Sequence, residues 1–225
     1  MTRKTLIILL IATIYLFAIF ALWPQIDLGI AGLFHSSGRF IARGPTGDLW
    51  RRFFYDAPYL LLGAFLLTAL AKKCGRVEKG PDGRAIIFLV ATLALGPGLL
   101  VNGVLKEISH RPRPEQTRDF GGPWTFQPYE SFGGQCARNC SFVSGEAATA
   151  AWTLAPALLA PPPARAFAVA AALLFTLATA GLRMAYGGHY LSDVTFAALF
   201  TFLIVLGAYQ WYRRPPRPKG EKPRE

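Results

Sequence analysis

The sequence predicts an all-α integral membrane protein, folded as one bundle of six transmembrane helices. Of its 225 residues, 52% are hydrophobic and only 16% are charged, which is too apolar for a typical soluble domain and short enough for one bundle. The apolar residues also gather into runs long enough to cross a bilayer. These runs are Thr5 to Trp23, Phe53 to Ala71, Ala85 to Leu105, Phe142 to Ala160, Ala166 to Leu182 and Tyr190 to Tyr212.

The first two runs need separate justification. The first follows Arg3 and Lys4 as a signal peptide would, but no small-residue cleavage motif precedes Trp23, so we interpret it as an uncleaved anchor. The second is the weakest, because Asp56 and Pro58 interrupt its start. We therefore expect a membrane domain over residues 1–212 and a basic, proline-rich cytoplasmic tail over 213–225.

The distribution of basic residues predicts the orientation of the bundle. With both termini on one side, that side carries 14 of the 24 Lys and Arg residues and the other side carries ten. Three of those ten are assigned to a site below, so the bias favours termini in the cytoplasm. The net charge of +11 does not indicate nucleic-acid binding, since the basic residues lack interleaved aromatics or a soluble fold to present them. The tail is expected to meet anionic lipid headgroups.

The first outer loop, residues 25–52, contains turn residues at Ser36 to Gly38. Its last part is an amphipathic segment that leads into the second helix. Two interpretations of its basic residues stay open: contact with phosphate-bearing headgroups, or ordinary solvated charge. These residues are Arg39, Arg43, Arg51 and Arg52. The inner loop, residues 72–84, shows no chemistry.

Cationic residues follow the third helix. Lys106 stands at its C-terminus, where a cation also favours the helix dipole. Arg113 lies between Pro112 and Pro114, which restrict the backbone and hold the guanidinium in a defined place. His110 and Arg111 are nearby residues whose involvement the spacing leaves open.

The second outer loop, residues 115–141, is long, and long loops in compact bundles are usually functional. It holds Cys136 and Cys140 on the side predicted to be oxidising, which favours a disulfide over two free thiols.

The two remaining polar segments border apolar runs. Ser144 is a good N-cap and Gly145 allows close approach to the backbone, so the helix start that contains Glu146 can hold an anion. Arg183 supplies a planar, permanently charged guanidinium group that can bind an anion through two N–H donors. If a helix begins near His189, then Asp193 lies one turn further on the same face and can orient the imidazole as a nucleophile or base.

Six alternating crossings bring all these helix ends to one side of the membrane. The topology and the charged positions come from different features of the sequence, so their agreement indicates a single site for a tetrahedral anion. The residues are Lys106, Arg113, Ser144, Gly145, Glu146, Arg183, His189 and Asp193.

This pattern resembles the three-part signature of the type 2 phosphatidic acid phosphatase (PAP2) superfamily, whose bacterial membrane members act on lipid phosphates. The resemblance covers Lys106 to Arg113-Pro114, Ser144-Gly145, and Arg183 through His189 to Asp193. It implies that His189 attacks phosphorus and becomes phosphohistidine while Asp193 orients it. It also implies that the basic residues and the Ser144-Gly145 backbone bind the phosphoryl oxygens, with no cofactor and no metal.

The chain departs from the family pattern at two positions. Glu146 stands where the family usually has a histidine that protonates the leaving group, and Leu182 stands where a serine usually precedes the arginine. Several explanations of Glu146 stay open. It could be shielded from the cations and act as the acid, His110 or water could replace it, or a phosphate leaving group could need little help.

The predicted function is an integral membrane lipid phosphatase with its active site on the periplasmic side of the inner membrane. The resemblance implies lipid A, phosphatidylglycerol phosphate, undecaprenyl pyrophosphate or phosphatidate as substrate, and no obligate protein partner is evident. A second hypothesis is a catalytically impaired relative that binds or translocates phospholipid. Haloperoxidases with bound vanadate use a similar site, but they are typically soluble.

Overall fold

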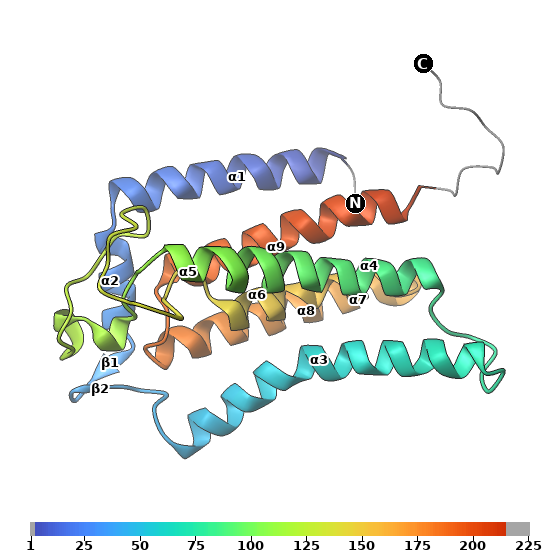
Figure 1. Ribbon diagram of the computed structural model, residues 1–225, viewed down its shortest axis with the longest axis horizontal. Coiled ribbons are helices and arrows are strands. Elements are labelled where there is room, and N and C mark those ends of the chain that lie inside the picture. Colours follow the sequence, from blue (N-terminus) through green and yellow to red (C-terminus); the bar gives the residue numbers. More distant parts are fainter. Residues whose placement is uncertain (1–2, 215–225) are drawn as a thin grey trace.

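The computed structural model describes residues 3–214, which form a bundle of helices lying roughly along one axis (Figure 1). Within that range five helices are long and apolar enough to cross a bilayer. They are α1 (Arg3–Leu22), α3 (Pro45–Lys73), the continuous helix Gly83–Ile108, α8 (Pro162–Ala185) and α9 (Leu191–Tyr212). The predicted all-α membrane class is confirmed.

The predicted fourth crossing differs from the other five, so the count of six spans is not confirmed. Residues 142–160 form two short helices, α6 (Gly145–Trp152) and α7 (Leu154–Leu159), which meet at Thr153. Together they extend for only about 22 Å, less than the thickness of a bilayer core. Both are buried, and α6 packs against α8 and α9. Small side chains explain this position, because alanines let the surrounding helices approach closely.

Helix α3 begins earlier than the sequence predicts. Pro45 starts it at a favourable first position, and the helix continues through Pro58 to Lys73 without a break. Asp56 and Pro58 therefore do not interrupt it. Pro58 is the buried residue of this otherwise exposed helix, so its ring packs against the bundle.

The third crossing changes its winding halfway. It starts as α4 (Gly83–Leu93), widens into a π-helical segment, η1 (Ala94–Leu105), and ends as α5 (Lys106–Ile108). Pro97 lies in the widened segment, and the side chain of Asn102 donates a hydrogen bond to its carbonyl oxygen at 2.7 Å. Wide turns of this kind occur often at functional sites. Here the wide turns precede the site residue Lys106.

Irregular segments cover one end of the bundle. The first outer loop contains helix α2 (Gln25–Gly32) and a hairpin of β1 (His35–Ser36) and β2 (Arg39–Phe40), neither of which the sequence predicts. Ser37 and Gly38 both have positive φ, which suits a tight two-residue hairpin turn. The second outer loop adds two short 3-10 helices, η2 (Pro114–Gln116) and η3 (Arg118–Phe120).

The opposite end of the bundle brings together the start of α1, the end of α3, the start of α4 and the end of α9 (Figure 1). Of the predicted basic tail, residues 215–225 lie outside the described residues. Two buried apolar clusters hold the helices together. One surrounds Phe196 near the irregular end and the other surrounds Trp152, whose indole N–H donates to the carbonyl of Leu89 at 3.1 Å.

Candidate active site

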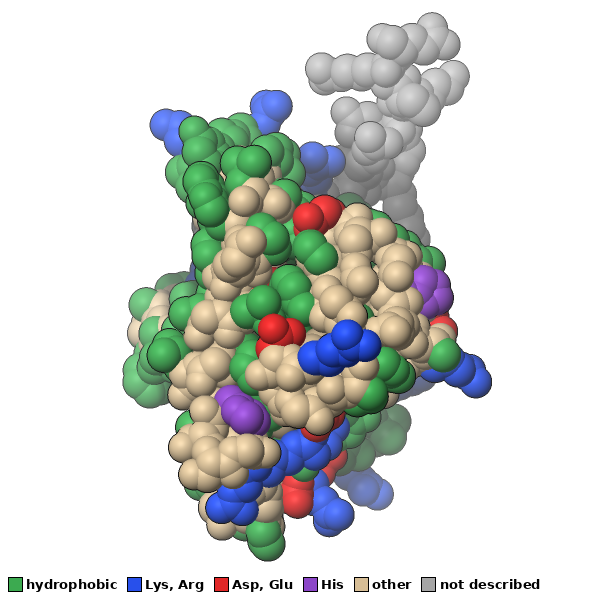
Figure 2. Space-filling model, turned by 90° about the vertical axis from the view of Figure 1, so that its left-hand side faces the viewer, with side chains coloured by type: hydrophobic (Ala, Val, Ile, Leu, Met, Phe, Trp, Pro, Cys, Tyr) green, Lys and Arg blue, Asp and Glu red, His purple; other side chains and the backbone are tan. Residues whose placement is uncertain are grey.

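A cavity of about 340 Å³ opens at the irregular end of the bundle, between α3, α5, α6 and α8. Figure 2 shows this end from outside, with basic and acidic side chains gathered toward its lower edge. The cavity is lined by Arg51, Tyr55, Tyr59, Asn102, Lys106, Arg113, Asn139, Gly145, Glu146, Thr149, Arg183 and His189. Six predicted site residues are thus in the wall. Ser144 immediately precedes the wall residue Gly145, and Oδ2 of Asp193 lies 3.8 Å from Nδ1 of the wall residue His189.

Positive charge dominates the cavity. Four cationic side chains line it against one carboxylate, Glu146. Burial lowers the pKa of Arg113, and the positive charge of Arg51 lowers it further. Arg183 is 2% exposed, and its Nε and one terminal nitrogen have no hydrogen-bond partner. Because unpaired buried donors are costly, this wall is built for an anion.

The start of helix α6 adds backbone donors to the same wall. The hydroxyl of Ser144 accepts a hydrogen bond from the N–H of Ala147 at 3.3 Å, which makes Ser144 the N-cap. A Cβ atom at Gly145 would lie 2.6 Å from Oδ1 of Asn102 and 3.2 Å from Nζ of Lys106. A larger residue at position 145 would therefore push the side chains of Asn102 and Lys106 away from the helix start.

Asn139 positions two of the cations. Its side-chain oxygen accepts a hydrogen bond from Nζ of Lys106 at 3.1 Å, and its backbone carbonyl accepts one from Arg113 at 3.0 Å. Cys136 and Cys140 are joined by a disulfide, so Asn139 lies inside a closed five-residue loop. The disulfide thereby acts on the site through a residue that the sequence did not single out.

His189 is oriented differently from the expectation. Helix α9 begins at Leu191, so His189 lies before the helix rather than on its face. Its Nδ1 lies 2.8 Å from the carbonyl oxygen of Ser141 and 3.8 Å from Oδ2 of Asp193. A carbonyl oxygen can only accept, so Nδ1 carries the hydrogen and Nε2 keeps the free lone pair.

The charge state of His189 suits a nucleophile. Its side chain is 2% exposed, and this burial lowers its pKa to about 4, with Arg183 acting in the same direction and Asp193 in the opposite one. The imidazole is therefore neutral near pH 7. A Cβ atom at the neighbouring Gly188 would lie 2.4 Å from the guanidinium of Arg183, so this glycine lets the arginine lie against the loop.

Asp193 belongs to a buried network behind the cavity. Its Oδ2 accepts hydrogen bonds from the Ser141 hydroxyl at 2.5 Å and from the N–H of Tyr190 at 2.8 Å. Its Oδ1 accepts from Arg111 at 2.6 Å. Asp193 therefore orients His189 indirectly, because it holds Ser141, whose carbonyl oxygen holds the ring.

Arg111 connects this network to the first outer loop. Its guanidinium is 1% exposed and also donates to Oδ2 of Asp27 on α2 at 2.7 Å. Burial acts to lower the pKa of Arg111, but Asp193 and Asp27 raise it on balance. The side chain does not line the cavity, so Arg111 is a positioning residue in this site.

Glu146 is held by two arginines. Its Oε1 accepts hydrogen bonds from Nε and a terminal nitrogen of Arg51, at 3.0 and 2.9 Å, and its Oε2 lies 3.5 Å from Nε of Arg183. It is therefore not shielded from the cations. Charge-assisted hydrogen bonds of this kind are shorter and stronger than those between neutral groups. His110 is not in the cavity wall, and its Nδ1 faces the carbonyl oxygen of Cys136 at 3.0 Å.

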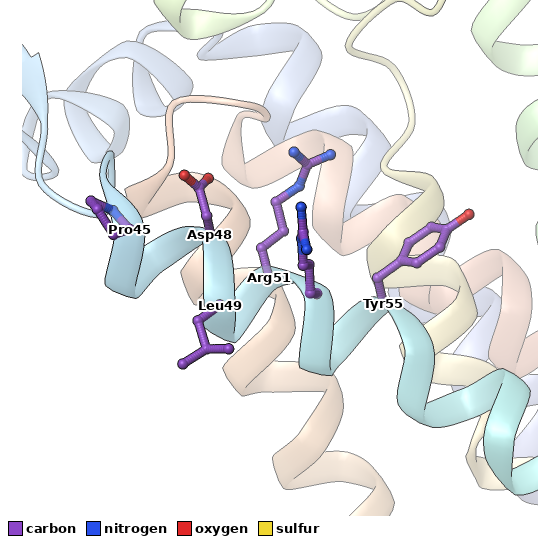
Figure 3. A pocket seen from close by; sticks show the side chains of 6 residues that line it. Pro45, Asp48, Leu49, Arg51 and Tyr55 are labelled. Atoms are coloured by element: carbon purple, nitrogen blue, oxygen red, sulfur yellow. The ribbon is translucent and has the colours of Figure 1, made fainter.

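The mouth of the cavity lies along α3. Arg51 and Tyr55 also line a wider hollow of about 560 Å³ with residues from the first three turns of this helix. Figure 3 shows Asp48, Arg51 and Tyr55 on one side of α3, with Leu49 pointing the opposite way. Arg43 pairs with Glu115 and donates to the carbonyl oxygen of Tyr186 at 3.0 Å. Of the four basic residues in the first outer loop, Arg43 and Arg51 thus have defined partners.

Several residues of the site carried no clear sequence signal. Arg51 and Asp27 come from the first outer loop, and Asn102, Asn139 and Ser141 lie outside the recognised spacing. Ser141 acts through its backbone carbonyl, which residue type does not reveal. The one available signal was the position of Arg51 at the amphipathic start of the second helix.

Comparison with known proteins identifies the family. A model of the PAP2 superfamily matches residues 85–217. The chain is 35% identical over 206 residues to a lipid A 4'-phosphatase of Rhizobium leguminosarum, covering 84% of this chain and 88% of that protein. It is 34% identical over 211 residues to a lipid A 4'-phosphatase of Francisella tularensis subsp. novicida, covering 90% and 93%. No solved structure gives a significant match.

An all-α membrane bundle with a cationic cavity and these relatives defines a membrane phosphoric ester hydrolase that acts on lipid phosphates. The family follows from the match over more than half of the chain. The chain belongs to the PAP2 superfamily.

Proposed function

We propose that this protein removes a phosphate from lipid A, or from a closely similar lipid phosphate, through a phosphohistidine at His189. The observation that carries the proposal is a neutral imidazole with a free Nε2 in a cavity where two buried nitrogens of Arg183 have no hydrogen-bond partner. Phosphoryl transfer depends mainly on in-line positioning and on stabilising the charge of the equatorial oxygens. The four cationic side chains of this cavity support the second requirement.

In the first step, Nε2 of His189 attacks phosphorus, and the bond from phosphorus to the lipid oxygen breaks as the N–P bond forms. Lys106, Arg113, Arg183 and the first N–H groups of α6 bind the three equatorial oxygens. The hydrogen stays on Nδ1 and is donated to the carbonyl oxygen of Ser141 throughout. The leaving oxygen takes a proton from a water molecule in the open cavity, and the hydroxide left behind is neutralised after the second step by the proton that Glu146 then carries.

In the second step, water attacks phosphorus, and the N–P electron pair returns to Nε2. Glu146 accepts the proton of this water, because its Oε2 has no hydrogen-bond partner and belongs to the cavity wall. Inorganic phosphate leaves and the neutral imidazole is restored. Glu146 thus serves as a base and also positions Arg51 and Arg183.

The relatives named lipid A 4'-phosphatase favour lipid A among the four candidate substrates. We also propose that the cavity faces the periplasm and that both termini face the cytoplasm. The supporting observations are the excess of basic residues at the terminal side and the placement of the disulfide beside the cavity.

The substrate assignment is tested with purified protein in detergent and a panel of the four lipid phosphates, with released phosphate as the readout. We expect turnover to be fastest with lipid A that carries a 4'-phosphate. Turnover of one of the other three lipids, without turnover of lipid A, would show that the lipid A assignment is wrong. Binding without turnover on any lipid would instead support the impaired, lipid-binding hypothesis.

Replacing Glu146 with glutamine should lower kcat by about 100-fold, because the base and the partner of two arginines are lost together. The same loss is expected with the lipid substrate and with p-nitrophenyl phosphate, whose leaving group needs no acid. Glu146→His should recover part of the activity that Glu146→Ala loses, since histidine also accepts a proton.

The control for this series is Glu107→Gln, an exposed acid at the same end of the bundle, which should leave kcat unchanged. A loss confined to the lipid substrate would show that Glu146 is the general acid. Activity equal to that of the parent in both Glu146→Ala and Glu146→His would show that Glu146 takes no part in catalysis.

The buried imidazole of His189 should titrate near pH 4 rather than near 6.5, because burial lowers its pKa to about 4. An unfolded chain then takes up this proton at a higher pH than the folded chain. The contribution of His189 to stability is thus complete above pH 6.5 and falls as the pH drops toward 4. The chain has three histidines, so NMR of histidine-labelled protein can follow each one. A midpoint near 6.5 for the resonance that His189→Asn removes would contradict this prediction.

A further inference from the structure

An apolar groove lies inside the bundle, separate from the charged cavity. It has a volume of about 370 Å³, and its walls come from α3, the junction of α6 and α7, and α8. Representative wall residues are Ala57, Pro58 and Leu61 from α3, Ala157 from α7, and Ala171 and Phe175 from α8. Five of its eleven wall residues are alanines, so small side chains create the space.

Among the wall residues that the structure describes, the groove has no free hydrogen-bonding side chain that an occupant would have to satisfy. Its polar wall residue, Thr153, donates its hydroxyl hydrogen to the carbonyl oxygen of Ala150 at 2.6 Å. Water would find no partners there, and a cavity of this kind binds apolar groups. The volume has room for about a dozen groups the size of a methylene, since a water molecule occupies about 30 Å³ in the liquid.

On all three walls, the groove lies deeper in the bundle than the charged residues of the phosphate cavity. Along α3, Ala57 lies about 9 Å beyond the cavity residue Arg51 and between the cavity residues Tyr55 and Tyr59. Along α6, Thr153 lies about 10 Å beyond Glu146, and along α8, Phe175 lies about 12 Å beyond Arg183. The groove therefore starts about 10 Å toward the bilayer centre from Arg51, Glu146 and Arg183, beside the inner part of the cavity that Tyr59 and Thr149 line. The acyl chain of a bound lipid lies at this depth.

We infer that this groove holds an acyl chain of the phosphorylated lipid and selects substrates by the shape and length of that chain. The inference rests on the proposed lipid phosphatase activity. In a bilayer the chain is already in an apolar medium, so the groove contributes packing rather than burial from water. Packing depends on fit, and this makes the groove a specificity site rather than a general anchor.

The test fills the groove from an exposed wall position. Ala171→Phe should raise the KM for a long-chain lipid phosphate about tenfold, an effect typical of a misfit by one or a few methylene groups. Its kcat/KM for p-nitrophenyl phosphate should equal that of the parent. The matched control is Ala170→Phe, also exposed on α8 but on the face away from the groove, which should change neither value.

A second measurement, photo-crosslinking, tests lipid binding in the groove independently of the phosphatase activity. A lipid phosphate with a diazirine in its acyl chain should label peptides containing Ala57 to Phe65 or Ala168 to Phe175, and Ala171→Phe should abolish this labelling. Labelling that unlabelled lipid phosphate does not compete away would mean an ordinary bilayer lipid and would overturn the inference. The inference would also be overturned if Ala171→Phe lowered kcat/KM equally for the lipid phosphate and for p-nitrophenyl phosphate, or lowered it for neither. Absence of turnover by the parent on every lipid contradicts the proposed function alone, because the labelling still reports on the groove.

Discussion

Replacing His189 with asparagine is expected to lower kcat on lipid phosphate by about 10⁴-fold or more, as loss of a nucleophile does in other hydrolases. Asparagine keeps a side-chain N–H that can donate to the carbonyl oxygen of Ser141, so the loop should keep its shape. It has no lone pair able to attack phosphorus. The measurement is released phosphate under saturating substrate, with thermal unfolding as a check on folding.

The covalent intermediate supplies an independent readout. Lipid substrate labelled in its phosphate should leave label on the parent protein after an alkaline quench and none on His189→Asn. The comparison variant is His110→Asn. His110 has a positive φ of 50°, which asparagine tolerates, and its ring is outside the cavity wall. Full activity in His189→Asn would refute the proposed mechanism, and a large loss in His110→Asn would identify His110 as the acid.

Replacing Arg111 with leucine is expected to destabilise the protein by about 3–5 kcal/mol, the usual cost of breaking a buried ion pair from one side. Its guanidinium is 1% exposed and pairs with Asp27 at 2.7 Å and Asp193 at 2.6 Å. Removing it leaves two buried carboxylates without their cation. Thermal unfolding in detergent should show a clear fall in Tm, and the activity should fall as well because Asp193 no longer holds Ser141 in place.

The matched control is Arg118→Leu, an exposed arginine of the same outer loop, which should change stability by less than about 0.5 kcal/mol. The double variant Arg111→Leu with Asp27→Leu should lose less stability than the two single changes added together, since it removes one stranded charge. A Tm for Arg111→Leu equal to that of the control would show that the network contributes no stability.

The fold class followed from the sequence because hydrophobic length is a local property. A run of about 20 apolar residues is stable as a helix in a bilayer whatever its neighbours are, since its backbone groups must pair within the segment. The five long helices follow this rule. The segment that does not follow it is α6 and α7, whose alanines and buried position depend on the surrounding helices.

Much of the candidate site was also predictable, for a related reason. Successive crossings alternate in direction, so helix ends far apart in the chain meet at one side, and Lys106, Arg113, Gly145, Arg183 and His189 line one cavity. Ser144 is a helix N-cap as its residue type predicts. These are consequences of helix boundaries, which the apolar runs already mark.

The sequence by itself thus determined the five long membrane helices, the resemblance to the family and six of the residues that line the cavity. Only the tertiary structure decided how those residues pair: Glu146 with Arg51, Arg111 with Asp27 and Asp193, and His189 with the carbonyl of Ser141. The physical reason is that a hydrogen bond or ion pair depends on distances of about 3 Å between groups 48 to 95 residues apart. Hydrophobic periodicity fixes where a helix lies along the chain, whereas such distances exist only after the helices have packed.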